Sequence, residues 1–247
     1  YVRQNNQGRS EARNHGARLA RGRWFGFLDS DDAYVPGAFA KLELAAKASP
    51  DVGMFVGSRV LVDSSGQIIE RLSVDVKTDF SWQGWLHHCY GVPSCTFIRR
   101  DWFDRAGGFN KEYETAEDWE LYLRLAWLAC PMKAWPQPIC QYRIHDGNST
   151  RFIEDHLSAA AKTLEHQFEC ATPHPDVVRL RSSALASLYS TMAVQAIGVR
   201  NSGIAPVLLT QAMQYDAAFL YRNRIGLLED ILYSRQRAGE TEDIQHL

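Results

Sequence analysis

Three carboxylates stand within four residues in the sequence Asp29-Ser30-Asp31-Asp32. Like charges at such short spacing repel one another and destabilise a fold unless a cation lies among them. Hard divalent ions prefer oxygen ligands and can be shared between carboxylates and substrate phosphates. The alternative is a solvated acidic loop in which Asp32 caps a helix beginning near Pro36. The spacing by itself leaves both interpretations open.

The segments around this loop indicate how it is positioned. The apolar run 23–28 precedes it without alternation, which predicts a strand buried on both faces. Helices are predicted at 10–20 and from Pro36 onward. This order is typical of an α/β fold, in which ligands bind beyond the carboxyl ends of the strands. The acidic loop occupies that position, which puts the metal-binding interpretation on an equal footing with the solvated loop.

The two halves of the chain differ in the secondary structure that their sequences predict. In the first half we predict extended segments at 52–56, 59–62, 67–71, 92–98 and 141–145, and helices near 101–103 and at 115–128. In the second half we predict only helices, at 154–169, 176–199, 204–215 and 222–237. The sequence therefore predicts an α/β domain over residues 1–150 and an α-helical region over residues 151–247.

The composition narrows the class of protein. The 247 residues are 45% hydrophobic and 23% charged with a net charge of −2, as in a folded globular protein without a broad basic surface. Nucleic acid is therefore not an expected partner. The five cysteines form no CxxC pair and are predicted to be buried thiols in a reducing compartment. No apolar run is long enough to cross a bilayer. We expect a cytoplasmic protein, with peripheral attachment to the inner membrane surface left open.

Several motifs follow one another in a fixed order along the first 150 residues. They are Gln4-x-Asn6-x-Gly8-x-Ser10-x-Ala12-Arg13-Asn14-x-Gly16, Ala20-x-Gly22-x-Trp24, Phe27-Leu28-Asp29-Ser30-Asp31-Asp32, Arg99-Arg100 with Phe103 and Gly107-Gly108-Phe109, Glu117-Asp118 with Arg124, and Tyr142-Arg143-x-His145. Together they resemble the signature of family 2 glycosyltransferases with the GT-A fold. Family members normally begin with two further strands, whose turns hold the donor nucleotide, and neither is found here. The resemblance implies a GT-A-type, Rossmann-like mixed sheet that lacks its first strands, followed by an α-helical appendage.

The resemblance also implies roles for the acidic loop. Asp31 would be the direct ligand of Mn²⁺ or Mg²⁺, and Asp29 would contact the donor ribose or a metal-bound water. Asp29 and Asp31 are therefore the predicted metal residues, with Asp32 supporting the loop. Arg13 would face the nucleotide, although a surface arginine on its helix is the alternative.

Asp118 is implied to be the general base of an inverting transfer. It would take the proton from the acceptor hydroxyl as that oxygen attacks the anomeric carbon, while the metal stabilises the departing diphosphate. The alternative is a helix-capping pattern, because Thr115-Ala116-Glu117-Asp118 resembles a capping box in which Asp118 bonds back to the Thr115 amide.

Further residues are implied to bind substrate. Glu117 would contact the acceptor or support the base, and Arg143 and His145 would reach the diphosphate or the metal. Trp82, Trp85, His87 and His88 lie where such enzymes shape the acceptor pocket, although core packing is the alternative for the tryptophans.

The expected partners are a nucleotide-sugar donor, with UDP as the expected nucleotide, and a carbohydrate or lipid-linked acceptor. Self-association through the helical region is also considered. Two other functions stay open on the sequence: a nucleotidyltransferase built on a similar frame, and a non-catalytic, glycosyltransferase-like binding module.

Overall fold

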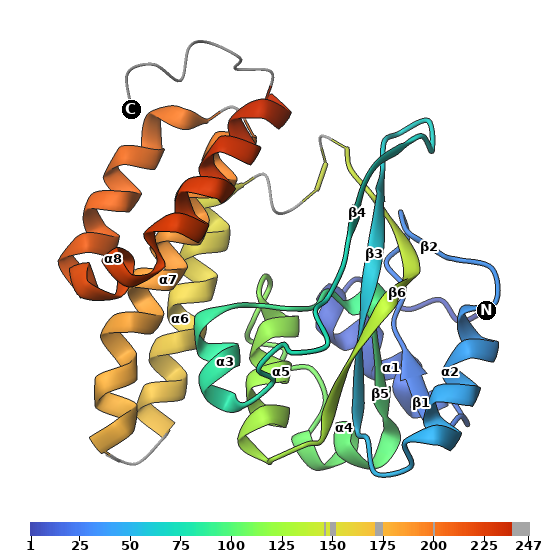
Figure 1. Ribbon diagram of the computed structural model, residues 1–247. Coiled ribbons are helices and arrows are strands. Elements are labelled where there is room, and N and C mark those ends of the chain that lie inside the picture. The colour runs from blue at the N-terminus through green and yellow to red at the C-terminus, as the bar shows by residue number, and fades with distance from the viewer. Residues whose placement is uncertain (146, 149–151, 171–174, 200, 239–247) are drawn as a thin grey trace. The chain divides into compact units, whose positions relative to one another are not determined.

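The computed structural model describes residues 1–145, 147–148, 152–170, 175–199 and 201–238 (Figure 1). The chain forms two units, Tyr1–Asn148 and Ser149–Leu247. The predicted boundary between residues 150 and 151 falls outside the described residues.

A mixed sheet of six strands organises the first unit. The strands are β1 (Trp24–Gly26), β2 (Ala33–Tyr34), β3 (Met54–Val62), β4 (Ile68–Leu72), β5 (Thr96–Arg99) and β6 (Met132–Arg143). Their order is β1-β5-β3-β6-β2, with β4 paired to β3. Only β3 and β6 pair in parallel, and because β5 is antiparallel to both β1 and β3, strands β1, β3 and β6 run in one direction. The loops that follow these three strands therefore leave the same edge of the sheet.

Helices cover both faces of this sheet. They are α1 (Gly8–Leu19), α2 (Ala38–Ala48), α3 (Trp82–His87), α4 (Arg100–Ala106) and α5 (Glu117–Trp127), with a 3₁₀ turn at Pro93–Cys95. Successive side chains of a strand point to opposite faces. On β5, the Phe97 ring packs at a tilt against Phe39 of α2, whereas Thr96 hydrogen-bonds to Tyr122 of α5 at 3.1 Å. Helices α2 and α5 thus lie on opposite sides of the sheet (Figure 1).

The strand before the acidic loop differs from the prediction. It was expected over residues 23–28 with both faces buried, but β1 has three residues, of which Trp24 is half-buried and Gly26 is exposed. Only β5 pairs with it, so β1 lies at an edge of the described sheet. Phe25 and Phe27 nevertheless pack into an aromatic cluster with Phe103, which anchors the start of the acidic loop.

Helix α5 begins at Glu117 rather than at Thr115. Ala116 has φ 61° and ψ 17°, a left-handed conformation that a right-handed helix cannot continue through. No side chain caps this helix end. The capping-box alternative for Asp118 is therefore not found in the structure.

The second unit contains only helices among its described residues, as predicted. They are α6 (Ile153–Cys170), α7 (Pro175–Gly198), a 3₁₀ turn at Ser202–Ile204, and α8 (Ala205–Ala238). Asp216 interrupts α8 with φ −157° and ψ 88°, and its Oδ1 accepts a hydrogen bond from the Phe219 amide at 2.7 Å. Asp216 therefore caps the second half of α8, which begins several residues before the predicted helix at 222–237. None of the described helices is both long enough and apolar enough to span a membrane.

The described cysteine side chains agree with the predicted buried thiols. Cys95, Cys130 and Cys140 are buried and free, and Cys89 is half-buried and free. Cys95 on the 3₁₀ turn and Cys140 on β6 touch through their sulfur atoms in the core beneath α2. The side chain of Cys170 lies outside the described residues.

Candidate active site

The acidic loop lies at the edge of the sheet where β1, β3 and β6 end. Because β5 runs in the opposite direction, the residues that precede it reach this same edge. Ser94 is one of them: it is fully buried, and its Oγ accepts a hydrogen bond from the Asp29 amide at 3.1 Å. The sequence offered no signal for Ser94, since it belongs to none of the motifs and meets the loop only through the antiparallel pairing.

Asp31 is paired with His145, which follows β6. His145 Nε2 lies 2.8 Å from Asp31 Oδ2, and each of the two side chains is about one-third exposed. The Gly147 amide donates to His145 Nδ1 at 3.0 Å, so a neutral imidazole carries its proton on Nε2 and donates it to Asp31. The structure thus brings together two residues that stand 114 positions apart.

Asp32 and Arg143 hold the acidic loop against the end of β6. Asp32 Oδ1 accepts a hydrogen bond from the Arg143 amide at 2.9 Å, and Arg143 Nε donates to the Asp31 carbonyl at 3.0 Å. Burial raises the pKa of Asp32, and the neighbouring Asp31 and Asp29 carboxylates raise it further. Asp32 does not cap α2, whose N-cap is Gly37. The predicted support role of Asp32 fits this geometry.

The Arg143 side chain binds main-chain oxygens. Besides the Asp31 carbonyl, its Nη1 donates to the Asp63 carbonyl at 2.9 Å, in the turn after β3. These bonds join the loops that follow β1, β3 and β6. Contact between Arg143 and a diphosphate stays a prediction.

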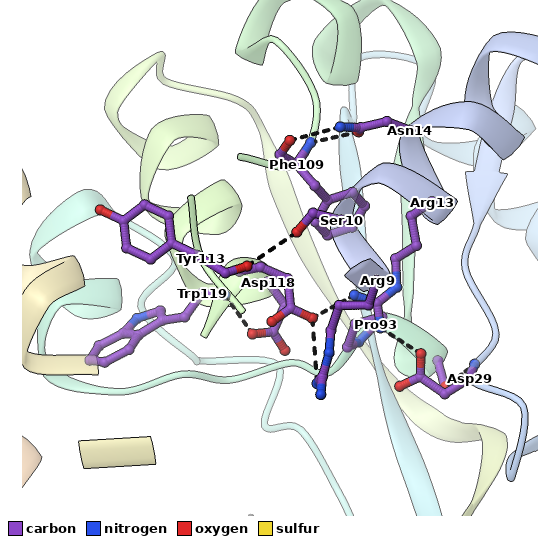
Figure 2. Close-up of polar contacts among 12 residues, drawn as sticks. Arg9, Ser10, Arg13, Asn14, Asp29, Pro93, Phe109, Tyr113, Asp118 and Trp119 are labelled. Carbon is purple, nitrogen blue, oxygen red and sulfur yellow. Dashed lines mark hydrogen bonds and ion pairs between the residues drawn. The ribbon is translucent and has the colours of Figure 1, made fainter. Parts of the chain in front are cut away.

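Arg13 of α1 links the acidic loop to the start of α5 (Figure 2). Its Nη2 lies 2.6 Å from Asp29 Oδ1, and its Nη1 lies 2.5 Å from Glu117 Oε1. The Arg13 side chain is only 12% exposed, so a surface position is excluded. Burial alone lowers the pKa of the guanidinium, but Asp29 and Glu117 outweigh it and hold the pKa above its usual range. Arg13 is therefore a permanent cation between two acidic segments.

Glu117 and Asp118 occupy the first turn of α5, where the helix dipole favours negative charge. Glu117 is 4% exposed on its side chain and is neutralised by Arg13. Among the described residues Asp118 has no ion-pair partner, and its Oδ1 accepts one hydrogen bond, from the Trp119 amide at 2.8 Å. Burial raises the pKa of Asp118 to about 7, and the Glu117 charge adds to the effect. A carboxyl with this pKa can exchange a proton near neutral pH.

Several other motif residues form the frame around this site. Asn14 of α1 makes two hydrogen bonds to the main chain of Phe109, at 2.8 and 2.9 Å. Arg124 of α5 binds Glu120 through two nitrogens and donates to the Gly108 carbonyl at 2.8 Å. Gly108 has φ +74°, and a Cβ added there would lie 2.7 Å from Asn14 Oδ1, so glycine is required. The frame holds Phe109 beneath the guanidinium of Arg13, 5.3 Å from its ring centroid.

The predicted acceptor-side aromatic residues belong mainly to the core. Trp85 is fully buried against Tyr122 of α5, and Trp82 packs edge-on against Trp127. The Trp119 indole donates to the Trp85 carbonyl at 2.7 Å. Core packing therefore accounts for both predicted tryptophans. His87 and His88 lie at the end of α3. Their contact with an acceptor stays a prediction.

The predicted residues thus form two neighbouring clusters. Arg13, Asp29, Glu117 and Asp118 lie on one side of the acidic loop, and Asp31, Arg143 and His145 lie on the other. The described residues contain no group of three or more His, Cys, Asp or Glu side chains arranged to hold a metal ion.

Comparisons with known proteins bear on the resemblance of this chain to family 2 glycosyltransferases. Residues 1–107 match the family described as "Glycosyl transferase family 2". An uncharacterized glycosyltransferase of Haemophilus influenzae is 25% identical over 121 residues, which cover 49% of this chain and 41% of that protein. The O-antigen biosynthesis protein RfbC of Myxococcus xanthus is 26% identical over 188 residues, which cover 70% of this chain and 14% of that protein.

A solved structure shares the fold. The structure of S. aureus TarS superposes with a TM-score of 0.52 at 12% identity, covering 95% of this chain and 44% of that chain. The chain spans less than half the length of each of these relatives. The GT-A-type mixed α/β fold with C-terminal helices is confirmed, and so is the resemblance to family 2 glycosyltransferases.

Proposed function

Because residues 1–107 match glycosyl transferase family 2, we propose that the chain transfers a sugar from a nucleotide diphosphate donor to an acceptor hydroxyl with inversion. The observation that carries the proposal is the double ion pair of Arg13. It connects Asp29 of the acidic loop to Glu117, the neighbour of Asp118. The residues proposed to bind the leaving group and to accept the proton of the nucleophile would thereby lie in one cluster, as the two halves of a displacement require.

The acidic loop fits a divalent ion that is shared with the donor. Asp31 and Asp29 each present a carboxylate that is 34% exposed, and carboxylate oxygens suit Mg²⁺ and Mn²⁺. Such ions are commonly held by one or two carboxylates together with substrate phosphates, which agrees with the absence of a larger ligand set among the described residues. When bound, the ion would stabilise negative charge on the departing diphosphate.

Asp31 would be the principal ligand, because Asp29 already directs Oδ1 to Arg13. A histidine that binds metal usually donates its other ring N–H to a partner. The Nδ1 of His145 instead accepts a hydrogen bond, which favours a role for His145 in orienting Asp31. Arg143 would hold the same loop through its main-chain bonds. The diphosphate contacts expected of these two residues remain part of the proposal.

Asp118 would act as the general base. A base works best when its pKa lies near the working pH, and burial brings this carboxyl to about 7. Asp118 would receive the acceptor proton on a carboxylate oxygen while the acceptor oxygen attacks the anomeric carbon. Glu117 is paired with Arg13, and its charge contributes to the raised pKa of Asp118.

The donor and acceptor are proposed at the level of class. UDP is the expected nucleotide, and a carbohydrate or lipid-linked acceptor suits a family whose relatives include a protein named for O-antigen biosynthesis. Polysaccharide synthesis is therefore the proposed context. A cytoplasmic location and self-association of the helical unit are also proposals.

The test is a donor screen on the full chain. UDP-, GDP- and dTDP-sugars would be incubated with Mn²⁺, and release of the nucleoside diphosphate would be measured alongside calorimetric binding of UDP with and without Mn²⁺. We expect the sugars of one nucleotide class to release their nucleoside diphosphate. We also expect Mn²⁺ and that nucleoside diphosphate to strengthen each other's binding. A nucleotidyltransferase would instead release pyrophosphate from a nucleoside triphosphate. A non-catalytic module would bind without turnover, and either result would overturn the proposal.

A further inference from the structure

A polar cavity of about 500 Å³ lies beside the start of α5. One wall is the segment 6–10, which enters α1, and the other is the segment 111–114, which leads toward α5. Ser10 Oγ joins the two walls by donating to the Tyr113 carbonyl at 3.4 Å. The volume falls within the range of small-molecule sites.

The cations of this cavity belong to shared ion pairs. Lys111 Nζ lies 2.5 Å from Glu11 Oε2, and the other oxygen of Glu11 pairs with Arg18. Arg9 Nη1 lies 3.9 Å from Glu117 Oε1, which also receives Arg13. The lining of the cavity contains no residue of the acidic loop, so it is separate from the loop proposed to hold the charged part of the donor.

The groups that remain available suit a hydroxyl-rich, uncharged ligand. The Glu114 carboxylate makes no ion pair or hydrogen bond within the described part of the chain, and the Asn6 amide uses only Oδ1, to accept from the Gly8 amide at 3.1 Å. Gly8 has φ +83°, and no atom lies within 4 Å of the position that a Cβ would occupy, so a ligand has room beside it. A carboxylate accepts hydrogen bonds from sugar hydroxyls, and an amide both donates and accepts them.

The position of the cavity connects it to the proposed base. Arg9 lines the cavity, and its Nη1 lies 3.9 Å from Oε1 of Glu117, the residue before Asp118. A second cavity, of about 300 Å³, lies between α2 and β6. It is lined by Phe55 and Trp135 and contains none of the predicted site residues. Of these two cavities, the polar one has a lining residue, Arg9, that approaches the first turn of α5, where the proposed base stands.

We propose that this polar cavity is the acceptor subsite and binds an uncharged sugar residue, with Glu114 and Asn6 as its hydroxyl-binding groups. The assignment rests on the proposed function, since it gives the occupant's hydroxyl a base in Asp118. A bound sugar would lie against segment 111–114 with one hydroxyl directed past Arg9 toward the first turn of α5. Glu114 would thus set which sugar is accepted, and Asp118 would act on it.

The experiment uses the full chain and a panel of p-nitrophenyl glycosides of common hexoses and N-acetylhexosamines. Binding is measured by saturation-transfer NMR for the wild type, Glu114→Ala, Asn6→Ala and the matched control Glu112→Ala. Glu112 is exposed on the same segment but does not line the cavity. We expect at least one glycoside to bind, with a Kd raised about tenfold by Glu114→Ala, less by Asn6→Ala and not by Glu112→Ala.

A second readout separates this proposal from the proposed function. Release of UDP from a UDP-sugar with Mn²⁺ and no acceptor reports on the donor site, and we expect the matched control Glu112→Ala to leave it unchanged. If no glycoside binds, or if Glu114→Ala binds glycosides as the wild type does, the acceptor subsite is wrong. If Glu114→Ala abolishes UDP release while glycoside binding persists, the cavity belongs to the donor. Absence of UDP release from the wild type would instead contradict the proposed function and leave the glycoside result to judge the cavity.

Discussion

Two acidic segments meet at this site, and they treat their carboxylates differently. In the acidic loop, Asp29 receives the Arg13 guanidinium and Asp31 receives the His145 imidazole. At the start of α5, Glu117 also receives Arg13, but Asp118 receives a single main-chain amide. Aspartate thus occurs in two environments. Asp29 and Asp31 each lie beside a nitrogen-containing side chain, whereas the buried Asp118 has one main-chain hydrogen bond.

This difference separates two chemical roles. The carboxylates that have a guanidinium or imidazole partner, Asp29 and Asp31, are the ones proposed to bind the metal ion and the ribose. A carboxyl that loses water without gaining a cation takes up a proton more readily, and the pKa of Asp118 rises to about 7 for that reason. Pairs of carboxyl groups whose environments differ in this way are a common basis for acid–base chemistry.

Replacement of the isolated carboxyl should have the largest effect. Asp118→Asn removes the proton acceptor and nearly preserves shape, so we expect sugar transfer to fall by about 10²–10⁴-fold. Calorimetric binding of UDP with Mn²⁺ should change little, because the acidic loop is untouched. Glu112→Gln is the control, because Glu112 is an exposed carboxylate that lies six residues before Asp118 in the sequence. Transfer by Asp118→Asn at the wild-type rate would exclude Asp118 as the base.

Removal of the cation that joins the two segments should mainly affect stability. Arg13→Ala leaves Glu117 buried with only the longer contact to Arg9, and we expect the free energy of unfolding to fall by about 3 kcal/mol. Urea denaturation measures this change. Arg18→Ala on the same helix is the control, since Arg18 is 58% exposed and its ion pair should contribute less than about 1 kcal/mol. Equal losses for the two variants would contradict a buried bridge.

Replacement of Asp31 in the acidic loop should affect the binding of Mn²⁺ more than the stability of the fold. Asp31→Asn weakens an oxygen ligand, and we expect the affinity for Mn²⁺ in the presence of UDP to fall at least about tenfold. Calorimetry would measure it, with Asp63→Asn, in the exposed turn after β3, as the control. His145→Ala should have a smaller effect if the imidazole only orients Asp31. A larger effect of His145→Ala would make the histidine a direct ligand.

The smallest expected effect is a pH-dependent difference in stability. An aspartate in an unfolded chain has a pKa near 3.9, so between about pH 4 and pH 7 the folded wild type binds a proton that the unfolded chain has lost. The stability of the wild type should therefore fall relative to Asp118→Asn over that range and level off above pH 7. We expect the variant to be more stable by about 1–3 kcal/mol at pH 8 and equal at pH 4. Denaturation curves that stay parallel from pH 4 to pH 8 would show that the pKa of Asp118 is not raised.

Much of the fold followed from local patterns. The helices of the second unit were predicted because apolar periodicity and prolines mark helix bodies and ends in any context. The strand before the acidic loop was predicted too long, because an apolar run does not reveal whether a strand is central or at an edge. Helix α5 was predicted to start two residues early, because Thr115 offers a cap that the left-handed Ala116 makes unusable.

For the candidate site, too, some features followed from the sequence and others only from the tertiary structure. The sequence by itself determined which residues carry charge, that three carboxylates share one loop, and that the motifs follow the order of a glycosyltransferase family. Only the tertiary structure decided their partners: Arg13 between Asp29 and Glu117, His145 on Asp31, and Ser94 beneath the loop. Those contacts depend on strand direction, because parallel β1, β3 and β6 end at one edge where antiparallel β5 begins. Burial, which sets the proton affinity of Asp118, likewise exists only once distant segments pack together.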